Sequence, residues 1–397
     1  MNNNISQLYK IATKQKRRIL GLMSGTSLDG LDLAFCEIEG NGMDTKLQVI
    51  AFDTIPYTTA FRNKLEACCF KADAKLEDIC QLNMETGRIH AGLINDFLSA
   101  HNISRERIDA IASHGQTFFH APATQLELEN GEYHQTLQLG DGDHIALLTG
   151  IITISDFRQK HVAAGGEGAP LVPYGELILF AEKENDVILI NIGGISNFSF
   201  FPSANTDQDI CFGDIGPGNA LMDAWMKAID PYRLFDESGK MAESGNVQNV
   251  LLEKLLKLHE SHSNTQSKGK ETYHLDFIQE ALKGLEELPP ADVMASLSAM
   301  TARLITATIL KYHRPEIPMK LYFSGGGLSN EYLMRKIMES LKQSNIHLAD
   351  CKEKGINPNS KEAVMFAILA NECLNGDPSV WKGISPAVSF GKISFPG

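Results

Sequence analysis

Two segments of this sequence share an arrangement that restricts the fold: a strand, a glycine-bearing turn and a second strand. In the first half, residues 18–23 and 31–38 flank the turn SGTSLDG. In the second half, residues 186–192 precede the turn GGISN, and FSFF follows it. Strands joined by such short turns are antiparallel neighbours. A further strand at 47–55 makes the first half a meander, unlike the strand-to-helix start of a Rossmann unit.

Strand-like and helix-like segments alternate over the rest of the chain, which is typical of α/β proteins. Residues 75–100 carry apolar side chains at helical spacing and predict one long helix. The short apolar runs at 108–112 and 151–154 are typical of buried strands. Further helices are predicted at 246–260, 291–312, 329–342 and 361–374. The repeated pattern therefore predicts two related α/β domains that face each other across a cleft.

We predict three parts along the chain. Residues 1–17 form a flexible basic arm, residues 18–184 the first domain, and residues 185–397 the second domain, whose C-terminal tail can pack back on the first. The apolar stretch at 19–23 after the basic arm is too short for a secretory signal. No run approaches the roughly 20 apolar residues of a membrane span. These features predict a cytoplasmic protein.

The composition narrows the function classes. The chain has 36 basic and 49 acidic residues and a net charge of −13, which disfavours nucleic-acid binding but not a small phosphorylated substrate. With 43% hydrophobic and 21% charged residues over 397 positions, it is expected to be globular rather than disordered, collagenous or coiled-coil. Seven cysteines without a C-x-x-C pair disfavour a disulfide scaffold or a zinc site. They predict buried or partly buried thiols in a reducing compartment.

The first chemical motif is GTSLDG at 25–30, which continues to Asp32. Backbone N–H groups and two hydroxyls in such a turn suit phosphate oxygens. Asp29 would repel phosphate unless a cation or a proton lies between, so water-bound Mg²⁺ or a neutral substrate would explain it. The alternative is an ordinary Gly/Ser hairpin in which Asp29 only forms the turn.

Three more glycine motifs lie in the second half: NIGGISN at 191–197, GDIGPGN at 213–219 and SGGGLSN at 324–330. Glycines in the first allow close backbone approach, although a plain hairpin is the alternative. The second leads into a predicted helix whose free N–H groups would suit an anion. The third would leave a flat surface that accepts an aromatic base. None matches a Walker A loop or a G-x-G-x-x-G fingerprint.

Two polar segments follow predicted strands in the first half, where ligands collect in α/β sheets. Asp156 precedes the flexible segment FRQKHVAAGGEGAP and is placed to act as a base. Arg158 can pair with Asp156 or with phosphate. A helix N-cap or a surface ion pair is the alternative for Asp156. In SHGQT, His114 and Gln116 would be polar groups at a strand end, and a structural role for the histidine is the alternative.

Six motifs in this order resemble the anhydro-N-acetylmuramic acid kinase family. They are GLMSGTSLDGLDLA, SHGQT, SDFRQKHVAAGGEGAPLVP, NIGGISNF, GPGNALMDAW and GGGLSN, within residues 21–330. The resemblance implies the fold of the sugar kinase, Hsp70 and actin superfamily, with two ribonuclease-H-like domains and ATP bound in the cleft between them. It also implies a homodimer.

The resemblance implies a reaction in cell-wall recycling. ATP, water and 1,6-anhydro-N-acetylmuramic acid would give N-acetylmuramic acid 6-phosphate and ADP, with Mg²⁺ as the expected cation. Asp156 would be the base that activates the water. His114, Gln116, Arg158 and Glu362 are expected at the sugar. The metal ligands are not predicted. The residues expected at ATP are Gly25, Thr26, Ser27, Leu28, Asp29, Gly30, Leu31, Asp32, Gly193, Gly194, Gly216, Gly218, Gly325, Gly326 and Gly327.

Two departures from the family pattern and two other functions stay open. Lys268 stands where a threonine is usual, and Asn359 replaces an acid in NPNSKEA, where Glu362 is retained. A kinase of the same fold acting on another anhydro sugar, such as a levoglucosan-like compound, is one alternative. The other is an actin-like ATP-binding protein that assembles or senses, which would not need Asp156 and would leave SDFR and HGQT unexplained.

Overall fold

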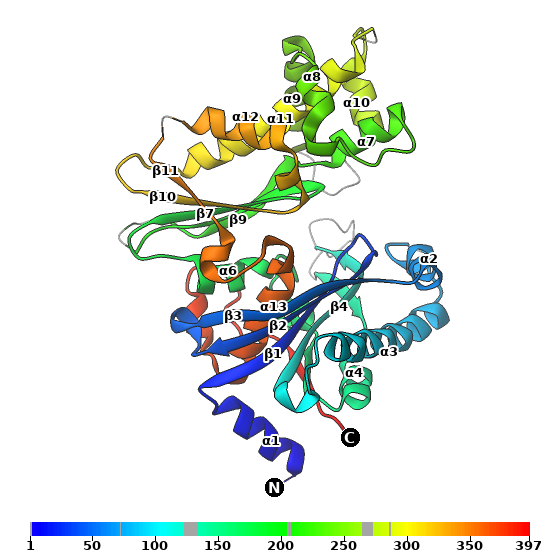
Figure 1. The fold of residues 1–397 in the computed structure, drawn as a ribbon, viewed down its shortest axis with the longest axis vertical. Helices are drawn as coiled ribbons and strands as arrows, with labels where there is room; N and C mark the ends of the chain where they lie inside the picture. Colours follow the sequence, from blue (N-terminus) through cyan, green and yellow to red (C-terminus); the bar gives the residue numbers. More distant parts are fainter. Residues whose placement is uncertain are drawn as a thin grey trace. The chain divides into compact units, whose positions relative to one another are not determined.

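The computed structural model describes residues 2–71, 73–122, 134–204, 206, 208–263, 273–285, 287–342 and 344–397. The chain divides into two compact units (Figure 1). Unit 1 comprises Met1–Phe180 and Lys352–Gly397, and unit 2 comprises Ala181–Cys351. The division near Phe180 lies close to the predicted boundary at 184. Residues 352–397 belong to unit 1, which corrects the prediction that the second domain extends to 397.

Unit 1 is built on a mixed sheet with the order β12-β6-β4-β1-β2-β3, and β5 pairs with β4. Its first strands form the predicted antiparallel meander, and β4 and β6 continue parallel to β1 on the other side. The strands are β1 (Lys16–Ser24), β2 (Gly30–Glu39), β3 (Lys46–Pro56), β4 (Ala110–Ala121), β5 (Gln135–Leu139), β6 (Thr153–Ser155) and β12 (Lys392–Ser394).

Unit 2 repeats this plan in its sheet, with the order β11-β10-β7-β8-β9. Again three antiparallel strands form a meander, and two parallel strands extend the sheet beyond the first strand. The strands are β7 (Asp186–Ile192), β8 (Ile195–Phe201), β9 (Cys211–Pro217), β10 (Met319–Ser324) and β11 (Ile346–Ala349). This shared order is that of a ribonuclease-H-like sheet, so the predicted α/β class and its duplication are confirmed.

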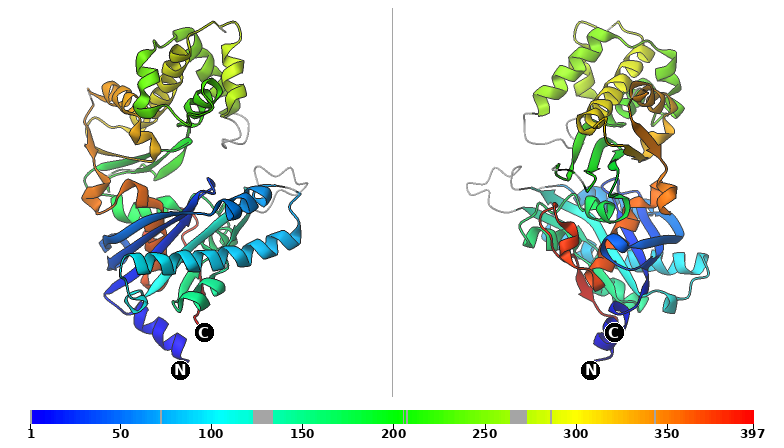
Figure 2. Two further views of the ribbon diagram at one scale, coloured as in Figure 1. Left: turned by 45° about the vertical axis from the view of Figure 1, so that its right-hand side comes forward. Right: turned by 90° about the vertical axis from the view of Figure 1, so that its left-hand side faces the viewer.

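Helices cover both faces of the unit 1 sheet. Leu20 and Leu22 of β1 pack in the cluster that contains α3 (Leu76–Ala100), which lies along the sheet in Figures 1 and 2. The opposite face carries α13 (Lys361–Asn375), and a Cβ added at Gly21 would lie 2.0 Å from the carbonyl oxygen of Ala363. Glycine therefore allows this close approach. The other helices are α1 (Asn3–Ala12), α2 (Thr59–Cys68), α4 (Gly142–Thr149), α5 (Phe157–Ala163) and α6 (Val172–Phe180).

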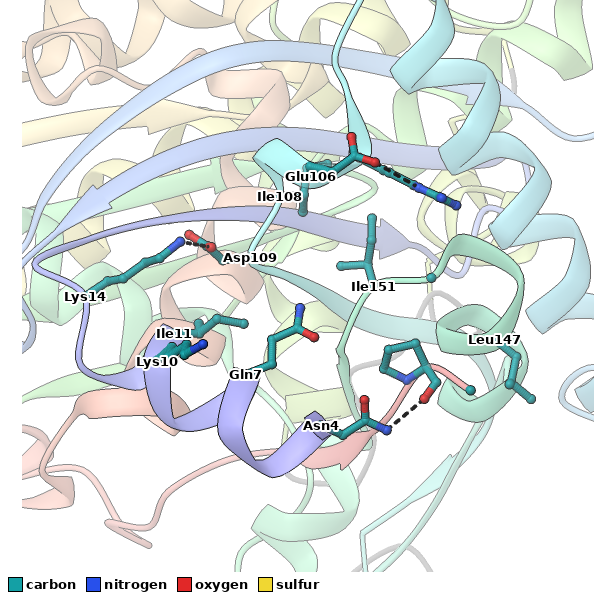
Figure 3. A pocket seen from close by; sticks show the side chains of 14 residues that line it. Asn4, Gln7, Lys10, Ile11, Lys14, Glu106, Ile108, Asp109, Leu147 and Ile151 are labelled. Carbon is teal, nitrogen blue, oxygen red and sulfur yellow. Dashed lines mark hydrogen bonds and ion pairs between the residues drawn. The ribbon is translucent and has the colours of Figure 1, made fainter. Parts of the chain in front are cut away.

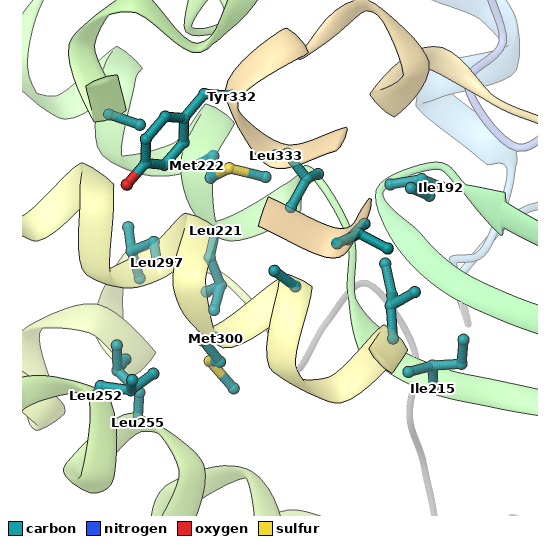
Figure 4. Close-up of a cluster of buried hydrophobic side chains, with 14 of the residues drawn as sticks. Ile192, Ile215, Leu221, Met222, Leu252, Leu255, Leu297, Met300, Tyr332 and Leu333 are labelled. Atoms are coloured by element: carbon teal, nitrogen blue, oxygen red, sulfur yellow. The ribbon is translucent and has the colours of Figure 1, made fainter. Parts of the chain in front are cut away.

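The core of unit 2 lies between one face of its sheet and a layer of helices (Figure 4). Ile190 and Ile192 of β7 and Met300 of α11 (Pro290–Tyr312) all belong to this cluster. By length and composition α11 could span a membrane, but two-thirds of its apolar window is buried in the fold, as expected of a core helix. The other helices are α7 (Ala220–Ile229), α8 (Lys240–Ser244), α9 (Asn249–Ser263), α10 (Leu275–Leu282) and α12 (Glu331–Leu341).

The N-terminal segment is ordered structure, which corrects the prediction of a flexible arm. Residues 3–12 form α1, and β1 already begins at Lys16. The Arg17 side chain is fully buried, donates to the carbonyl oxygens of Ala12 and Gly40, and reaches Asn371 Oδ1 at 2.6 Å. Burial lowers the pKa of Arg17. This arginine therefore ties α1 to β2 and α13, a contact that charge patterning alone does not reveal.

Three further expectations need correction. β4 runs to Ala121, so SHGQT lies within the strand and not at its end. Residues 211–217 form β9, so most of GDIGPGN is strand and not loop. Cys80 is exposed, whereas the other cysteines are buried or partly buried as predicted.

Candidate active site

The turn between β1 and β2 presents the first predicted phosphate motif. Thr26, Ser27 and Asp29 are exposed, and Ser27 Oγ donates to Asp29 Oδ1 at 2.6 Å. Leu28 has a left-handed backbone, with φ of 57°, and its side chain is buried in the unit 1 core. The buried leucine anchors the turn, so its hydroxyls and its carboxylate are held at the surface.

Gln116 supports this turn from the neighbouring strand β4. Its Oε1 accepts from Ser24 Oγ at 2.6 Å, and its Nε2 donates to the carbonyl oxygen of Gly25 at 3.0 Å. Ser24 Oγ also lies 2.7 Å from the Tyr57 hydroxyl. Gln116 is buried, and both ends of its amide are engaged by the protein. Gln116, predicted to contact the sugar, therefore supports the turn between β1 and β2 through hydrogen bonds.

His114 is buried in β4 and orients Arg158. Its Nδ1 donates to the carbonyl oxygen of Gly115 at 2.8 Å, and its Nε2 accepts from Arg158 Nε at 2.9 Å. Burial, and then the charge of Arg158, hold the pKa of His114 well below its usual range, so the ring is neutral. Burial lowers the pKa of Arg158 to about 10. Within the described residues, the terminal amino groups of Arg158 have no hydrogen-bond partner and can meet an anion.

Asp156 occupies the junction between β6 and α5 in a left-handed backbone conformation, with φ of 57° and ψ of 36°. Such a conformation costs about 1 kcal/mol or more in a residue other than glycine. Its side chain makes no capping hydrogen bond to α5, so the N-cap alternative does not explain it. Burial raises the pKa of Asp156, and the ammonium of Lys392 at 3.7 Å opposes that rise. A half-buried carboxylate without a cap role is suited to accept a proton.

Glu362 joins these groups from the first turn of α13. Its pKa is raised, first by desolvation, while Lys361 and Arg158 lower it and Asp32 raises it. Asp32 itself has a raised pKa because of burial, and it accepts from Thr54 Oγ1 at 2.5 Å. Unit 1 therefore gathers the turn between β1 and β2, SHGQT, Arg158 and Glu362 into one connected region.

The glycine motifs of unit 2 pack directly against one another. The N–H groups of Gly218 and Asn219 donate to the carbonyl oxygens of Gly194 and Gly193, both at 2.8 Å. These two N–H groups, which directly precede α7 (Ala220–Ile229), are therefore occupied by the turn after β7. A Cβ on Gly218 would lie 2.3 Å from the Gly193 oxygen. The turn after β7 is therefore held by the segment after β9.

The third glycine motif meets the same turn through Ile192. A Cβ added at Gly325, whose φ is 92°, would lie 2.6 Å from the Ile192 oxygen, and one at Gly327 would lie 2.3 Å from Ile192 Cγ2. Gly216, at the end of β9, has a φ of 149° and faces His259 and Leu304. The predicted nucleotide glycines therefore share one region of unit 2.

A pocket of about 320 Å³ opens beside this region, a size at the low end for small-molecule sites. Its polar lining includes Asp223, whose pKa burial raises to about 6. Asp236 is committed elsewhere, because its carboxylate accepts from the Met241 and Ala242 N–H groups. Sequence reasoning singled out Gly326 and quoted the motifs that contain Asn219, Met222, Asp223, Ser329 and Asn330 without giving these residues a role. It missed Phe235, Asp236 and Ser238, which only folding brings to the pocket.

Comparisons with known proteins show the family of this chain. The sequence profile of the anhydro-N-acetylmuramic acid kinase family matches residues 17–395. The chain belongs to this family. Anhydro-N-acetylmuramic acid kinase of Pseudoalteromonas atlantica is 42% identical, and the alignment covers 100% of both chains. The enzymes of the same name from Pseudoalteromonas translucida (38% identical; 100% of each chain) and Caldanaerobacter subterraneus (34%; 98% of this chain and 100% of the relative) are further relatives.

The family match leaves α1 outside its limits, and α1 lines a second cavity of about 660 Å³ (Figure 3). Asn4, Gln7 and Lys10 lie on its helical wall, and Asp109, paired with Lys14, lies on the facing side. None of the predicted site residues lines this cavity. It is therefore separate from the connected region of unit 1.

Asn359 and Lys268 are the two positions that depart from the family pattern. Asn359 is exposed in the short helix Pro358–Ser360, and its N–H donates to Asn357 Oδ1 at 3.1 Å. The residue therefore sits in a local turn that needs no acid. Lys268 lies outside the described residues.

Proposed function

We propose that this chain is an ATP-dependent kinase that opens the 1,6-anhydro ring of 1,6-anhydro-N-acetylmuramic acid and phosphorylates O6. The products are N-acetylmuramic acid 6-phosphate and ADP, as needed to recycle peptidoglycan. Membership of the kinase family over residues 17–395 supports the reaction. The observation that carries the mechanism is the Asp156 carboxylate, which is half-buried, uncapped and held by a left-handed backbone at the end of β6.

The chemistry explains why such a carboxylate is needed. In the anhydro sugar O6 bridges to C1, so no free 6-hydroxyl is available to a kinase. Asp156 orients a water and takes its proton as the water oxygen bonds to C1 and the C1–O6 bond breaks. The released O6 bonds to the γ-phosphorus of ATP, and ADP leaves. The electrophilic phosphorus thus takes the place of the acid that a glycosidase would supply.

Neighbouring groups would place the sugar and the phosphates. The free amino groups of Arg158 can bind a substrate oxygen, while neutral His114 fixes the plane of the guanidinium. The turn Gly25–Asp29, braced by Gln116, would receive phosphate oxygens. Phosphoryl transfer depends mainly on such positioning and on charge neutralisation. Glu362 would contact the sugar beside Arg158.

Unit 2 would supply the nucleoside end of ATP. The interlocked glycines near Ile192 and the pocket of about 320 Å³ offer backbone and an apolar wall that suit a purine. We place the adenosine at Gly325–Gly327 and the phosphate side at Gly193 and Gly194.

Mg²⁺ is part of the proposal. Among the described residues, no group of three acidic, histidine or cysteine side chains could hold a metal ion. Mg²⁺ is commonly held by one or two carboxylates together with phosphates and water. Asp29 and Asp32 lie close enough to influence each other electrostatically and fit that pattern. Bound there, the ion would neutralise phosphate charge. We further propose that the enzyme is cytoplasmic and homodimeric.

The test is an ADP-release assay with 1,6-anhydro-N-acetylmuramic acid, Mg²⁺ and ATP, followed by mass analysis of the sugar. The expected product carries both an added water and a phosphoryl group. Levoglucosan serves as the competing substrate. Turnover of levoglucosan alone would contradict the proposed substrate, and ATP-dependent assembly without any phosphorylated sugar would contradict the enzyme itself.

A further inference from the structure

The last strand of the chain brings a lysine to Asp156. β12 pairs antiparallel with β6, and Lys392 is the direct partner of Ser155, the residue before Asp156. The Lys392 ammonium lies 3.7 Å from Asp156 Oδ2. β12 is held closely in place, because Gly391, with φ of 97°, would put an added Cβ 2.5 Å from Ile154 Cγ2. The position of the lysine backbone is therefore fixed relative to the carboxylate.

A second charge acts on Asp156 with the opposite sign. Asp141 caps the start of α4, where its Oδ1 accepts from the Asp143 N–H. The start of α4 packs against β6, since a Cβ on Gly142 would lie 2.7 Å from Ser155 Oγ. Among the described residues, Asp141 raises the pKa of Asp156, and Lys392 lowers it.

Other titratable side chains on the same elements are directed elsewhere. Arg158 donates to His114, and His161 bonds to the Tyr174 hydroxyl at 3.0 Å. The remaining ones on these elements, none of which contributes to the shift of Asp156, are Lys160 on α5, and Asp143 and His144 on α4. The base candidate is thus influenced by one cation and one anion, which come from different parts of the chain.

We propose that Lys392 is a positioning residue of the ring-opening reaction, which acts through Asp156 because its ammonium keeps that carboxylate ionised. This inference rests on the proposed function, in which Asp156 accepts the proton of the attacking water. Only the ionised carboxylate can accept that proton, whereas burial favours the protonated acid. A nearby cation offsets that effect.

The exposure of the lysine sets the size of the effect. The Lys392 side chain is 71% exposed, so water screens its attraction and the pair stays weak. A stronger pair would make Asp156 a poorer base, because proton-transfer rates follow basicity. Lys392 therefore extends activity toward lower pH and changes the maximal rate little.

The test is the pH dependence of kcat/KM from about pH 5 to about pH 9 in a charge series at position 392. Lys392→Arg should leave the acidic limb unchanged. Lys392→Met should move the acidic limb of the kcat/KM profile to a pH about half a unit higher, and Lys392→Glu to a pH about one unit higher. Asp141→Asn should move it downward. Raising the salt concentration should shrink the shift of the wild type against Lys392→Met.

The outcomes separate the two proposals. If Asp156→Asn retains turnover, Asp156 is not the base and the proposed mechanism fails. If Asp156→Asn is inactive but the limb coincides in the Arg, Met and Glu variants, the role of Lys392 is overturned. A lower plateau without a limb shift would also overturn it, because that result indicates only a structural contact of β12. The melting temperature of each variant confirms that it is folded.

Discussion

The two units share one strand order but place different chemistry at corresponding turns. Unit 1 carries carboxylates that are partly removed from water: Asp32 near the start of β2, Asp156 directly after β6 and Glu362 in the first turn of α13. Burial raises the pKa of each. In unit 2 the corresponding turns carry glycines whose backbones touch one another around Ile192. The same strand order therefore carries partly buried carboxylates in one unit and closely packed glycines in the other.

The difference has a physical cause. A proton acceptor must be desolvated but not neutralised, so unit 1 keeps carboxylates beside cations at moderate distance. In the proposed nucleotide site, a flat base and phosphate oxygens need backbone that comes close, which residues without a Cβ in unit 2 would allow. Substitution of Asp156 in unit 1 should therefore affect turnover, whereas substitution of the packed glycines in unit 2 should affect nucleotide affinity.

The largest expected effect tests the chemical role of unit 1. Asp156→Asn should lower kcat by a factor of about 10² or more, because an amide cannot accept the proton of the attacking water. Nucleotide affinity, measured by calorimetry, should stay unchanged. Asp96→Asn, on the exposed surface of α3, is the control. If Asp156→Asn lost ATP binding instead, the proposed division of roles between the two units would be wrong.

The next effect concerns the packing of unit 1. Gly21→Ala should lower the free energy of unfolding by about 3 kcal/mol, because its Cβ would meet the backbone oxygen of Ala363 at 2.0 Å. Gly92→Ala in exposed α3, where no atom lies within 4 Å, should instead stabilise by about 0.5–1 kcal/mol. Urea unfolding measures both. If both substitutions changed the free energy of unfolding equally, β1 and α13 could move apart without loss of stability.

A smaller effect tests the shape-based role of unit 2. Gly218→Ala should raise the KM for ATP about tenfold, a loss of about 1.4 kcal/mol in binding. The cause is that its Cβ would displace the Gly193–Gly194 turn. Gly213→Ala, whose nearest neighbour is the Phe198 ring at 3.8 Å, is the matched control in β9. Steady-state kinetics with each substrate varied in turn checks this. A change confined to the sugar KM would contradict it.

The smallest effect concerns the one strongly shifted acid in the unit 2 pocket. Burial raises the pKa of Asp223 to about 6 in the folded protein, above its unfolded value of 3.8. The ionised form is thus disfavoured on folding, and stability falls as pH rises from about 4 through 6. Asp223→Asn should stabilise the protein by about 1 kcal/mol at pH 7.5, after allowance for solvent screening.

Melting temperatures at two pH values check the Asp223 prediction. The difference in melting temperature between wild type and Asp223→Asn should shrink toward about pH 4, where the side chain at position 223 is neutral in both folded proteins. Asp236→Asn should instead lower the melting temperature, because the Asp236 carboxylate accepts two backbone N–H groups. A constant difference across pH would mean that the Asp223 carboxylate is not desolvated.

Local patterns predicted much of the fold. The strand–turn–strand repeats, the helix at 75–100 and the helix at 361–374 follow from spacing of apolar residues and from glycines, and β1, β2, α3 and α13 confirm them. The prediction failed where long-range contacts decide. Arg17 becomes a buried tie only because Asn371 is folded beside it, and local charge had indicated a loose arm.

The sequence by itself determined the family, the duplicated sheet and the position of Asp156 after a buried strand, because these depend on local order and motif. Tertiary structure decided which motif side chains form hydrogen bonds within the protein and which remain available to a ligand. It turned Gln116 into a brace and His114 into the support of Arg158, since hydrogen bonds between strands and helices cannot be read along the chain. It also returned residues 352–397 to unit 1, where β12 sets Lys392 beside Asp156. Pairing between distant segments is chosen by packing of the whole core, and sequence spacing does not record it.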